Sequence, residues 1–221
     1  MRYPDTGSMV TPMPPTGTRI SRAERRAETR ERLIDAAERR FTRDGFHATS
    51  VDAVAEDAGF TKGAVYSNFA GKEELFFAVY ERHVEQRAAE LDAVVAAAPS
   101  TRAEIRAAVA SADHGEDGWL ALFFEFWAHV LRNPEHRARF AELHKRGLAP
   151  LVRSIEATGR RRPLAMAPEL LATAQLALGN GMQLERLTRP EDVGPEAFQE
   201  AMWLFVRGAA GFDDEDEEDG R

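Results

Sequence analysis

The sequence predicts an all-α fold, and three observations lead to that prediction. Apolar residues recur at steps of three and four along most of the 221-residue chain, whereas no stretch alternates as a half-buried strand does. Capping residues and helix-stopping glycines and prolines separate these periodic segments. Two short helical patterns flank a glycine between Thr49 and Leu75, as in a helix-turn-helix. We therefore expect an N-terminal three-helix domain containing this motif and a larger C-terminal helical domain, with about nine helices in all.

The first 21 residues are expected to form a disordered extension, because residues 1–18 contain four prolines and few large apolar side chains. A first helix is predicted from about Arg22 or Thr29 to Asp44, where Gly45 ends it. Several arginines lie in and before this helix, and they predict either an arm that enters a DNA minor groove or a solvated basic segment. They are Arg19, Arg22, Arg25, Arg26 and Arg30.

The helix-turn-helix is predicted from its capping residues. Thr49 is expected to cap the first helix, with Asp52 three residues later completing a capping box, and Gly59 is expected to end it. Thr61 then caps a second helix over residues 62–68. Its outward side chains are Lys62, Tyr66, Ser67 and Asn68. Because such groups donate to phosphates or base edges, and a helix N-terminus adds free N–H groups, this turn is suited to DNA.

The run GFTKGAVYSNFAGKEEL, residues 59–75, resembles the DNA-binding domain of TetR-type (TetR/AcrR) bacterial transcriptional regulators. It fits the recurring Gly-x-Ser/Thr-Lys-Gly-x-x-Tyr-x-x-Phe-x-x-Lys-Glu-x-Leu pattern at every named position. Gly71 and Phe60 depart from the usual serine and smaller aliphatic residue, which affects capping and packing. The resemblance implies a set of DNA-contacting residues. They are Thr49, Ser50, Thr61, Lys62, Gly63, Tyr66, Ser67, Asn68 and Lys72.

The resemblance also implies a function. It indicates a homodimeric regulator, expected to be a repressor, that binds a palindromic double-stranded DNA operator and is released by a small apolar or amphipathic effector. Two other classes stay open at this point. One is a helical ligand-binding protein or enzyme with a vestigial helix-turn-helix, and the other is a protein that packages DNA without sequence preference.

The remaining helices follow from apolar periodicity and helix-ending residues. They are expected at residues 72–97, 119–131, 134–158, 168–187 and 195–210. One more helix is expected to start at a capping box formed by Thr101 and Glu104. Pro150 predicts a kink or break, and residues 159–167 a loop. The predicted domains are 22–89 for DNA binding and 90–212 for ligand binding and dimerisation, followed by a disordered acidic tail at 213–221.

The most aromatic segment, residues 119–131, is apolar on nearly all sides and is therefore expected to be central to the second domain. Its aromatic residues are equally compatible with a packed core and with the effector cavity that the resemblance implies. The candidate cavity residues are Trp119, Phe123, Phe126, Trp127, Phe140 and Gln175, with Glu125, His129, Asn133, His144 and Gln183 as further polar candidates. The candidate dimer residues are Leu171, Ala174, Leu178, Met182, Phe198, Met202 and Phe205.

Composition limits the other classes of function. The chain contains no cysteine, and its six histidines lack HExxH spacing, so we assign no metal and no cofactor. It also lacks GxSxG, Walker and GxGxxG motifs, so we expect no enzymatic activity. No apolar run is long enough to cross a membrane, so we expect a cytoplasmic protein without a membrane partner.

The net charge of −8 argues against a nucleic-acid partner only at first sight, because seven acidic residues lie in the tail. Without residues 213–221 the chain has 28 basic and 30 acidic residues, so DNA binding would depend on a local basic patch. The tail itself is either a solubilising end or a segment that competes with DNA for the arginines.

Overall fold

The structure is a computed structural model that describes residues 21–97, 117–160 and 163–210. These residues form eight helices and no strand, which confirms the all-α prediction. The helices are α1 (Arg22–Asp44), α2 (Val51–Ala58), α3 (Lys62–Tyr66), α4 (Lys72–Ala97), α6 (Asp117–Arg132), α7 (Pro134–Gly159), α8 (Pro168–Thr188) and α9 (Pro195–Ala210). Three predicted features lie outside the described residues: most of the N-terminal extension, the capping box at Thr101 and the acidic tail.

The first helix starts at the earlier of the two predicted positions because Ser21 and Glu24 form a capping box. The Ser21 hydroxyl accepts the backbone N–H of Glu24 at 3.1 Å, and the Glu24 carboxylate accepts the N–H of Ser21 at 2.6 Å. Both contacts satisfy donors that a helix start leaves unpaired. Gly45 ends α1 with a φ of 85° and a ψ of 164°, a combination that essentially only glycine adopts.

The predicted cap of α2 was wrong by one residue. Ser50, not Thr49, is the N-cap, and its side chain accepts the N–H of Ala53 at 3.1 Å. Thr49 is buried instead and donates its hydroxyl to the Gly45 carbonyl at 2.8 Å. The spacing to Asp52 suggested Thr49, but the hydroxyl next to it is the one that reaches the α2 backbone. Gly59 ends α2 in the left-handed conformation, as predicted.

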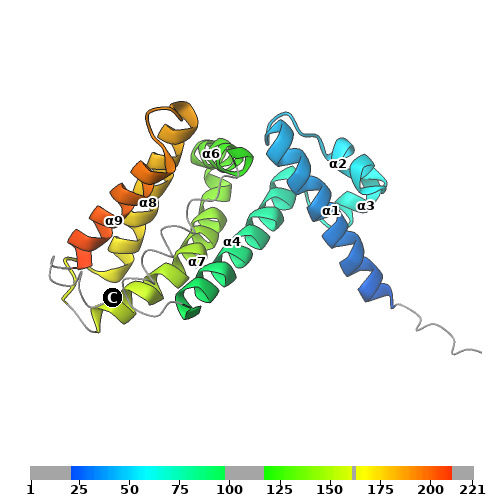
Figure 1. Ribbon diagram of the computed structural model, residues 1–221. Coiled ribbons are helices and arrows are strands. Elements are labelled where there is room, and N and C mark those ends of the chain that lie inside the picture. Colours follow the sequence, from blue (N-terminus) through cyan, green and yellow to red (C-terminus); the bar gives the residue numbers. More distant parts are fainter. Residues whose placement is uncertain (1–20, 98–116, 161–162, 211–221) are drawn as a thin grey trace, which may run out of the picture.

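One apolar core extends from the helix-turn-helix into the second domain. Phe46, between α1 and α2, contacts Phe76 of α4 and Phe126 of α6 with ring centroids 5.6 and 4.9 Å apart. Phe76 and Phe126 stack at 3.7 Å. Figure 1 shows how α4 runs from α1–α3 into the other helices, so the predicted domain boundary at residues 89/90 lies inside one continuous helix.

The C-terminal helices α8 and α9 lie side by side at the end of the molecule farthest from α1–α3 (Figure 1). α8 packs against α7, which continues through a buried Pro150. Of the predicted kink or break, the break is therefore wrong, and the kink stays a prediction because proline removes one backbone hydrogen bond. Within the described part of the chain, no helix combines the length and apolar character that a membrane crossing requires.

Candidate functional site

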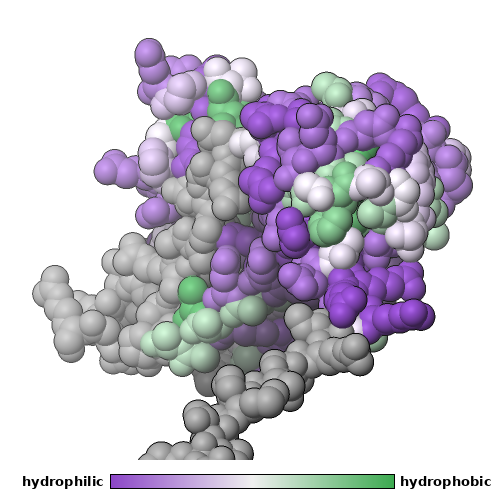
Figure 2. Space-filling model, turned by 90° about the vertical axis from the view of Figure 1, so that its right-hand side faces the viewer, coloured by the Kyte–Doolittle hydropathy of each residue, from purple (hydrophilic) through white to green (hydrophobic). Residues whose placement is uncertain are grey.

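The second helix of the helix-turn-helix presents its polar residues to solvent. Thr61 caps α3 by accepting the N–H of Ala64 at 3.3 Å, which leaves the first turn of the helix exposed. Figure 2, viewed from the side on which α1–α3 lie, shows a mainly hydrophilic surface interrupted by a small apolar patch. The predicted contact residues that are exposed are Ser50, Thr61, Lys62, Gly63, Tyr66 and Ser67.

Lys62 is held in place by Asp52 of α2, whose carboxylate lies 2.9 Å from the lysine amine. The hydrogen bond to Asp52 raises the lysine pKa above its ordinary value. Both side chains are mostly exposed, so the pair contributes little to stability. The amine is charged and held close to α3, where a phosphate would compete with Asp52 for it.

Three of the predicted DNA contacts, Thr49, Asn68 and Lys72, form hydrogen bonds within the domain. Thr49 is 3% exposed, so its side chain does not reach the surface. Asn68 donates its amide to the Ala64 carbonyl at 2.8 Å. Lys72 donates to the carbonyls of Phe46 and His47 at 2.9 and 3.2 Å, and its amine lies 4.5 Å from the Phe46 ring centroid. These side chains hold the turns of the domain together, a role that their polar character did not reveal.

The arginines of α1 are part of a helix rather than of an extended arm. Arg26 donates to the Ser67 carbonyl at 3.1 Å, and Arg30 lies over the Phe69 ring at 5.1 Å. The arm hypothesis is therefore wrong for every arginine from Arg22 onward, because the capping box starts the helix before them. Arg19 lies outside the described residues. Arg26 and Arg30 instead bring positive charge beside the end of α3.

The turn between α1 and α2 is fixed to the second domain by Glu125 of α6. One oxygen of this carboxylate accepts the N–H of Phe46 and the other that of His47, each at 2.8 Å. Lys72 holds the carbonyls of the same two residues. A Cβ on residue 45 would lie 2.8 Å from the Glu125 carboxylate, so this close contact between the carboxylate and the turn favours glycine at position 45. Glu125, expected as a cavity residue, therefore joins the two domains.

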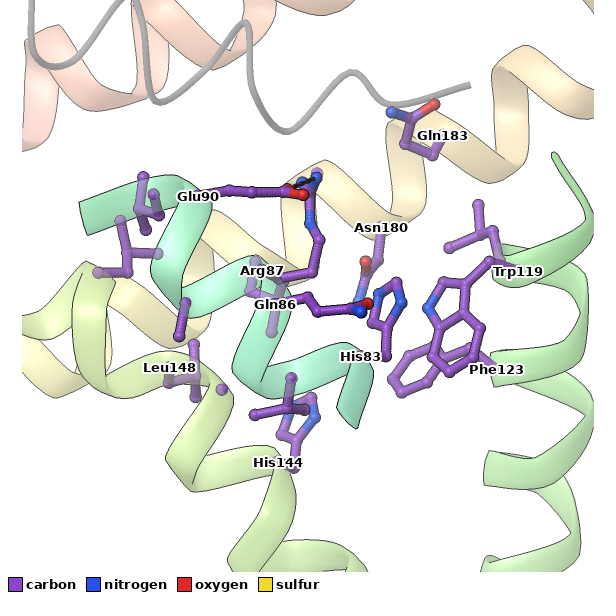
Figure 3. A pocket seen from close by; sticks show the side chains of 18 of the residues that line it. His83, Gln86, Arg87, Glu90, Trp119, Phe123, His144, Leu148, Asn180 and Gln183 are labelled. Carbon is purple, nitrogen blue, oxygen red and sulfur yellow. Dashed lines mark hydrogen bonds and ion pairs between the residues drawn. The ribbon is translucent and has the colours of Figure 1, made fainter. Parts of the chain in front are cut away.

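A cavity of about 360 Å³ lies among α4, α6, α7, α8 and α9 (Figure 3). Of the predicted residues, Trp119, Phe123 and Gln175 line it, together with His144 and Gln183. Phe126 and Phe140 are buried in the core, and Trp127 packs against Phe140 with centroids 5.5 Å apart. A helix that is apolar all round has one face for the core and another for the cavity, and the sequence pattern does not separate them.

The polar part of the cavity comes mainly from α4, which the sequence analysis did not single out. His83 stacks on Trp119 with ring centroids 3.7 Å apart, and Figure 3 shows the Gln86 and Asn180 amides pointing toward His83. Arg87 and Glu90 form an ion pair at 2.9 Å on the same side. The sequence contains a pattern that could have indicated this polar wall of the cavity. Polar residues at positions 83, 86, 87 and 90 share one helical face, which continues from buried Val79.

Burial lowers the pKa of His83 from 6.5 to about 3, with a smaller contribution from the charge of Arg87. Since the unfolded chain takes up this proton near pH 6.5 and the folded protein does not, acid favours unfolding between these values. We expect the free energy of unfolding to fall by up to about 1.4 kcal/mol per pH unit there on account of His83 alone. Urea unfolding between pH 7 and pH 4 would show a shallower loss for His83→Phe, and an identical pH dependence would contradict this burial effect.

Three of the predicted dimer residues face the interior of their own chain. Phe198 and Met202 are buried, with Leu178 and Met182 packed against them, and Leu171 is buried as well. Ala174 and Phe205 are half-buried. The outward faces of α8 and α9, which we call the outer stripe, carry Leu170, Ala177, Gly181 and Leu184 on α8 and Ala197, Leu204 and Gly208 on α9. Helical period gives each of these helices two faces, and the predicted dimer residues lie mainly on the inner one.

Comparisons with known proteins identify the two parts of the chain. Residues 33–79 match the family model of bacterial regulatory proteins of the tetR family, and residues 102–209 match that of the BetI-type transcriptional repressor C-terminal domain. A curated relative, the transcriptional activator FasR of Mycolicibacterium smegmatis, is 32% identical over 111 residues. That match spans 48% of this chain and 49% of the relative, so about half of the relative's length is compared.

Solved structures show the same fold over nearly their full length. A putative TetR-family regulator from Rhodococcus sp. superposes with a TM-score of 0.71 at 17% identity, covering 83% of this chain and 99% of that one. FadR from Bacillus subtilis, solved in complex with stearoyl-CoA, superposes with a TM-score of 0.63 at 16% identity, and the match covers 80% of this chain and 98% of FadR. The relatives are transcriptional regulators, which agrees with the expectation of a protein that is not an enzyme. The chain is a helix-turn-helix transcriptional regulator and belongs to the TetR family.

Proposed function

We propose that this protein is a repressor that binds a near-palindromic operator as a homodimer and leaves it when a small amphipathic molecule occupies the cavity. The observation that carries the proposal is the double role of α6. Trp119 and Phe123 of this helix line the cavity, while its Glu125 holds the turn between α1 and α2. A ligand that displaces α6 would therefore act directly on the position of the helix-turn-helix.

The exposed surface of α3 supports binding to DNA. Lys62 and the hydroxyls of Thr61 and Tyr66 lie at the surface, and Arg26 brings charge to the end of the helix. A single helix-turn-helix reads only half of a useful site, because dimers place two such helices about 34 Å apart, one turn of DNA, or a multiple of it. The outer stripe offers the apolar surface through which two chains would set this distance.

The cavity supports an amphipathic effector. Its volume of about 360 Å³ lies near the lower end of small-molecule sites, which span about 300–1,000 Å³. Trp119, Phe123 and Leu148 supply apolar walls, whereas Gln86 and Asn180 supply amide donors and acceptors. The neighbour FadR holds stearoyl-CoA, which also has an apolar and a polar part. An effector that releases DNA must bind the DNA-incompetent arrangement more tightly.

The sign of regulation is proposed from the C-terminal domain. The matched family model describes a repressor, and it covers residues 102–209, which include the cavity walls supplied by α6, α7, α8 and α9 but not those of α4. The relative FasR is an activator, but its match extends over about half of its length. A reporter gene placed behind the operator would distinguish repression from activation. Deletion of a repressor raises expression of the reporter, whereas deletion of an activator lowers it.

The proposal is tested with Lys62→Ala and electrophoretic shifts of genomic fragments. We expect the wild type to select particular fragments, and Lys62→Ala to weaken binding to operator and random DNA in similar proportion, because a phosphate contact carries no sequence information. The log–log salt slope should become shallower by about one per chain. Arg153→Ala, which removes an exposed charge on α7 paired with Asp92, is the matched control and should bind normally.

Three results would contradict this proposal. An unchanged salt slope in folded Lys62→Ala would remove the assigned phosphate contact. Similar wild-type affinity for all duplexes would favour sequence-independent packaging, since specific sites are normally bound at least about a thousandfold more tightly. The absence of any shifted genomic fragment would favour a ligand-binding protein that retains the helix-turn-helix fold without its activity.

A further inference from the structure

Three potential metal ligands meet where α4, α6 and α7 come together. They are the carboxylate of Glu73 and the imidazoles of His129 and His136, which we call the junction triad. One ligand atom from each residue can be chosen so that all three lie within 4.8 Å of one another. Within this group, His129 Nε2 lies 3.9 Å from a carboxylate oxygen of Glu73. The absence of cysteine and of HExxH spacing led to the expectation of no metal, and no local motif connects these three residues because they come from different helices.

The local structure fixes the backbone positions of the two histidines. His129 lies in the last turn of α6, and its carbonyl accepts the Asn133 side-chain amide at 2.6 Å. His136 lies in the first turn of α7, and its backbone N–H donates to the Asn133 backbone carbonyl at 3.1 Å. The short turn thus brings the end of one helix to the start of the next, and the rings lie 5.9 Å apart. Glu73, in the first turn of α4, completes the group.

One ring nitrogen of the triad lacks a hydrogen-bond partner. His129 Nε2 is buried and forms no hydrogen bond within the described structure. A buried polar atom left unpaired costs about 1–3 kcal/mol, and such atoms in folded proteins often mark a site for a bound ion or water. Zn²⁺ is bound by imidazole nitrogens of this kind.

We propose that the junction triad binds a divalent transition-metal ion of the Zn²⁺ type. Two imidazoles and one carboxylate form a ligand set suited to Zn²⁺ and unsuited to Mg²⁺ or Ca²⁺, which prefer oxygen ligands. Bonds of about 2.1 Å in tetrahedral geometry separate ligand atoms by about 3.4 Å. Because the ligand atoms of the triad lie within 4.8 Å of one another, they need to approach by at most about 1.4 Å, a distance that side-chain rotations cover.

The surroundings allow access and set the expected strength. The triad residues are half-buried, so an ion can enter from solvent, and a solvent water would then supply the fourth ligand. The His47 ring, 5.5 Å from that of His129, is an alternative. The positive charge of Lys72 opposes a cation, although its amine is engaged by two carbonyls. With one carboxylate against this charge, we expect a moderate rather than a very high affinity.

Bound metal would connect the start of α4 to α6 and α7 next to the turn that Glu125 holds. Such an ion ties the DNA-binding domain to the ligand domain through a second link, independent of the cavity. Because it binds the folded junction and not the unfolded chain, it raises the melting temperature as its concentration exceeds the dissociation constant. This effect provides a readout that does not depend on DNA binding.

The test uses the full chain without a polyhistidine tag, stripped of metal and titrated with Zn²⁺ by calorimetry. We expect one ion per chain, a raised melting temperature and no response to Mg²⁺. His136→Ala and Glu73→Gln should each weaken Zn²⁺ binding at least tenfold, whereas Glu142→Gln, an exposed acid elsewhere on α7, should bind as the wild type does. Titration with Co²⁺ should give visible absorption bands of nitrogen and oxygen ligation in the wild type that are lost in His136→Ala.

Two outcomes would overturn the proposal. One is wild-type Zn²⁺ affinity in both His136→Ala and Glu73→Gln, with folding shown by circular dichroism, which would place the ion elsewhere. The other is the absence of binding by the wild type at Zn²⁺ concentrations several times that of the protein. His47→Ala distinguishes the fourth ligand within the proposal, since weaker binding assigns the position to His47 and unchanged binding assigns it to water.

Discussion

Replacing Leu204 by glutamate is expected to convert the protein from dimers into monomers and to reduce operator binding at least a hundredfold. Leu204 is 56% exposed at the centre of the α9 part of the outer stripe. In a two-fold interface the substitution places a charge in the contact twice, and a buried unpaired charge costs several kcal/mol. A hundredfold loss corresponds to about 2.7 kcal/mol. Light scattering measures the mass, and electrophoretic shifts measure operator binding.

The matched control is Leu131→Glu. Leu131 is a leucine of similar exposure, 59%, but it lies on α6 outside the outer stripe. This variant should remain dimeric and bind the operator normally. If Leu204→Glu stayed dimeric, the outer stripe would not be the interface. If it were monomeric and still bound the operator with full affinity, the spacing of two recognition helices would not be required.

Replacing Gly45 by alanine is expected to lower the free energy of unfolding by about 3 kcal/mol or more. The backbone there has a φ of 85° with an extended ψ, which costs a non-glycine residue about 1–3 kcal/mol. In addition, the new methyl group would lie 2.8 Å from the Glu125 carboxylate. That contact either displaces Glu125 or breaks its hydrogen bonds to the turn. Chemical unfolding measures the loss of stability.

Gly59→Ala is the control for backbone strain alone. Gly59 has a left-handed φ of 72°, but the nearest atom to an added Cβ is the end of the Arg32 side chain, at 3.6 Å. This variant should lose only about 1–2 kcal/mol. In a Glu125→Ala background the cost of Gly45→Ala should shrink toward that of Gly59→Ala. Equal costs of Gly45→Ala in both backgrounds would show that the contact with Glu125 has no energetic role.

The fold followed from the sequence because its determinants are local. The starts of α4 at Lys72 and of α9 at Pro195 were predicted correctly, and Gly45 and Gly59 were identified as helix stops, because helical period and glycine conformation depend on residues close in the chain. The cap of α2 was misplaced because two neighbouring hydroxyls, Thr49 and Ser50, compete for one role. Only the packing of Thr49 against Gly45 distinguishes them.

The candidate sites were predicted less completely because they depend on which face of a helix meets which neighbour. Phe198 and Leu204 both lie on α9, but one is buried and the other exposed, and the apolar pattern alone does not say which side a partner would cover. Glu125 was expected among the polar residues of the cavity, which it does not line. Its role arises from a turn 78 residues away in sequence, a relation that no local pattern contains.

The stacking of His83 on Trp119 gives the protein an optical reporter inside its own cavity. Indole emission responds to the polarity and the contacts of the ring, and the depressed pKa of His83 keeps the neighbouring imidazole uncharged under ordinary conditions. A molecule that contacts this stacked pair would change the emission of Trp119. Compounds can therefore be screened by tryptophan fluorescence before any operator is known, with Trp127→Phe and Trp203→Phe used to isolate the signal of Trp119, the tryptophan that lines the cavity.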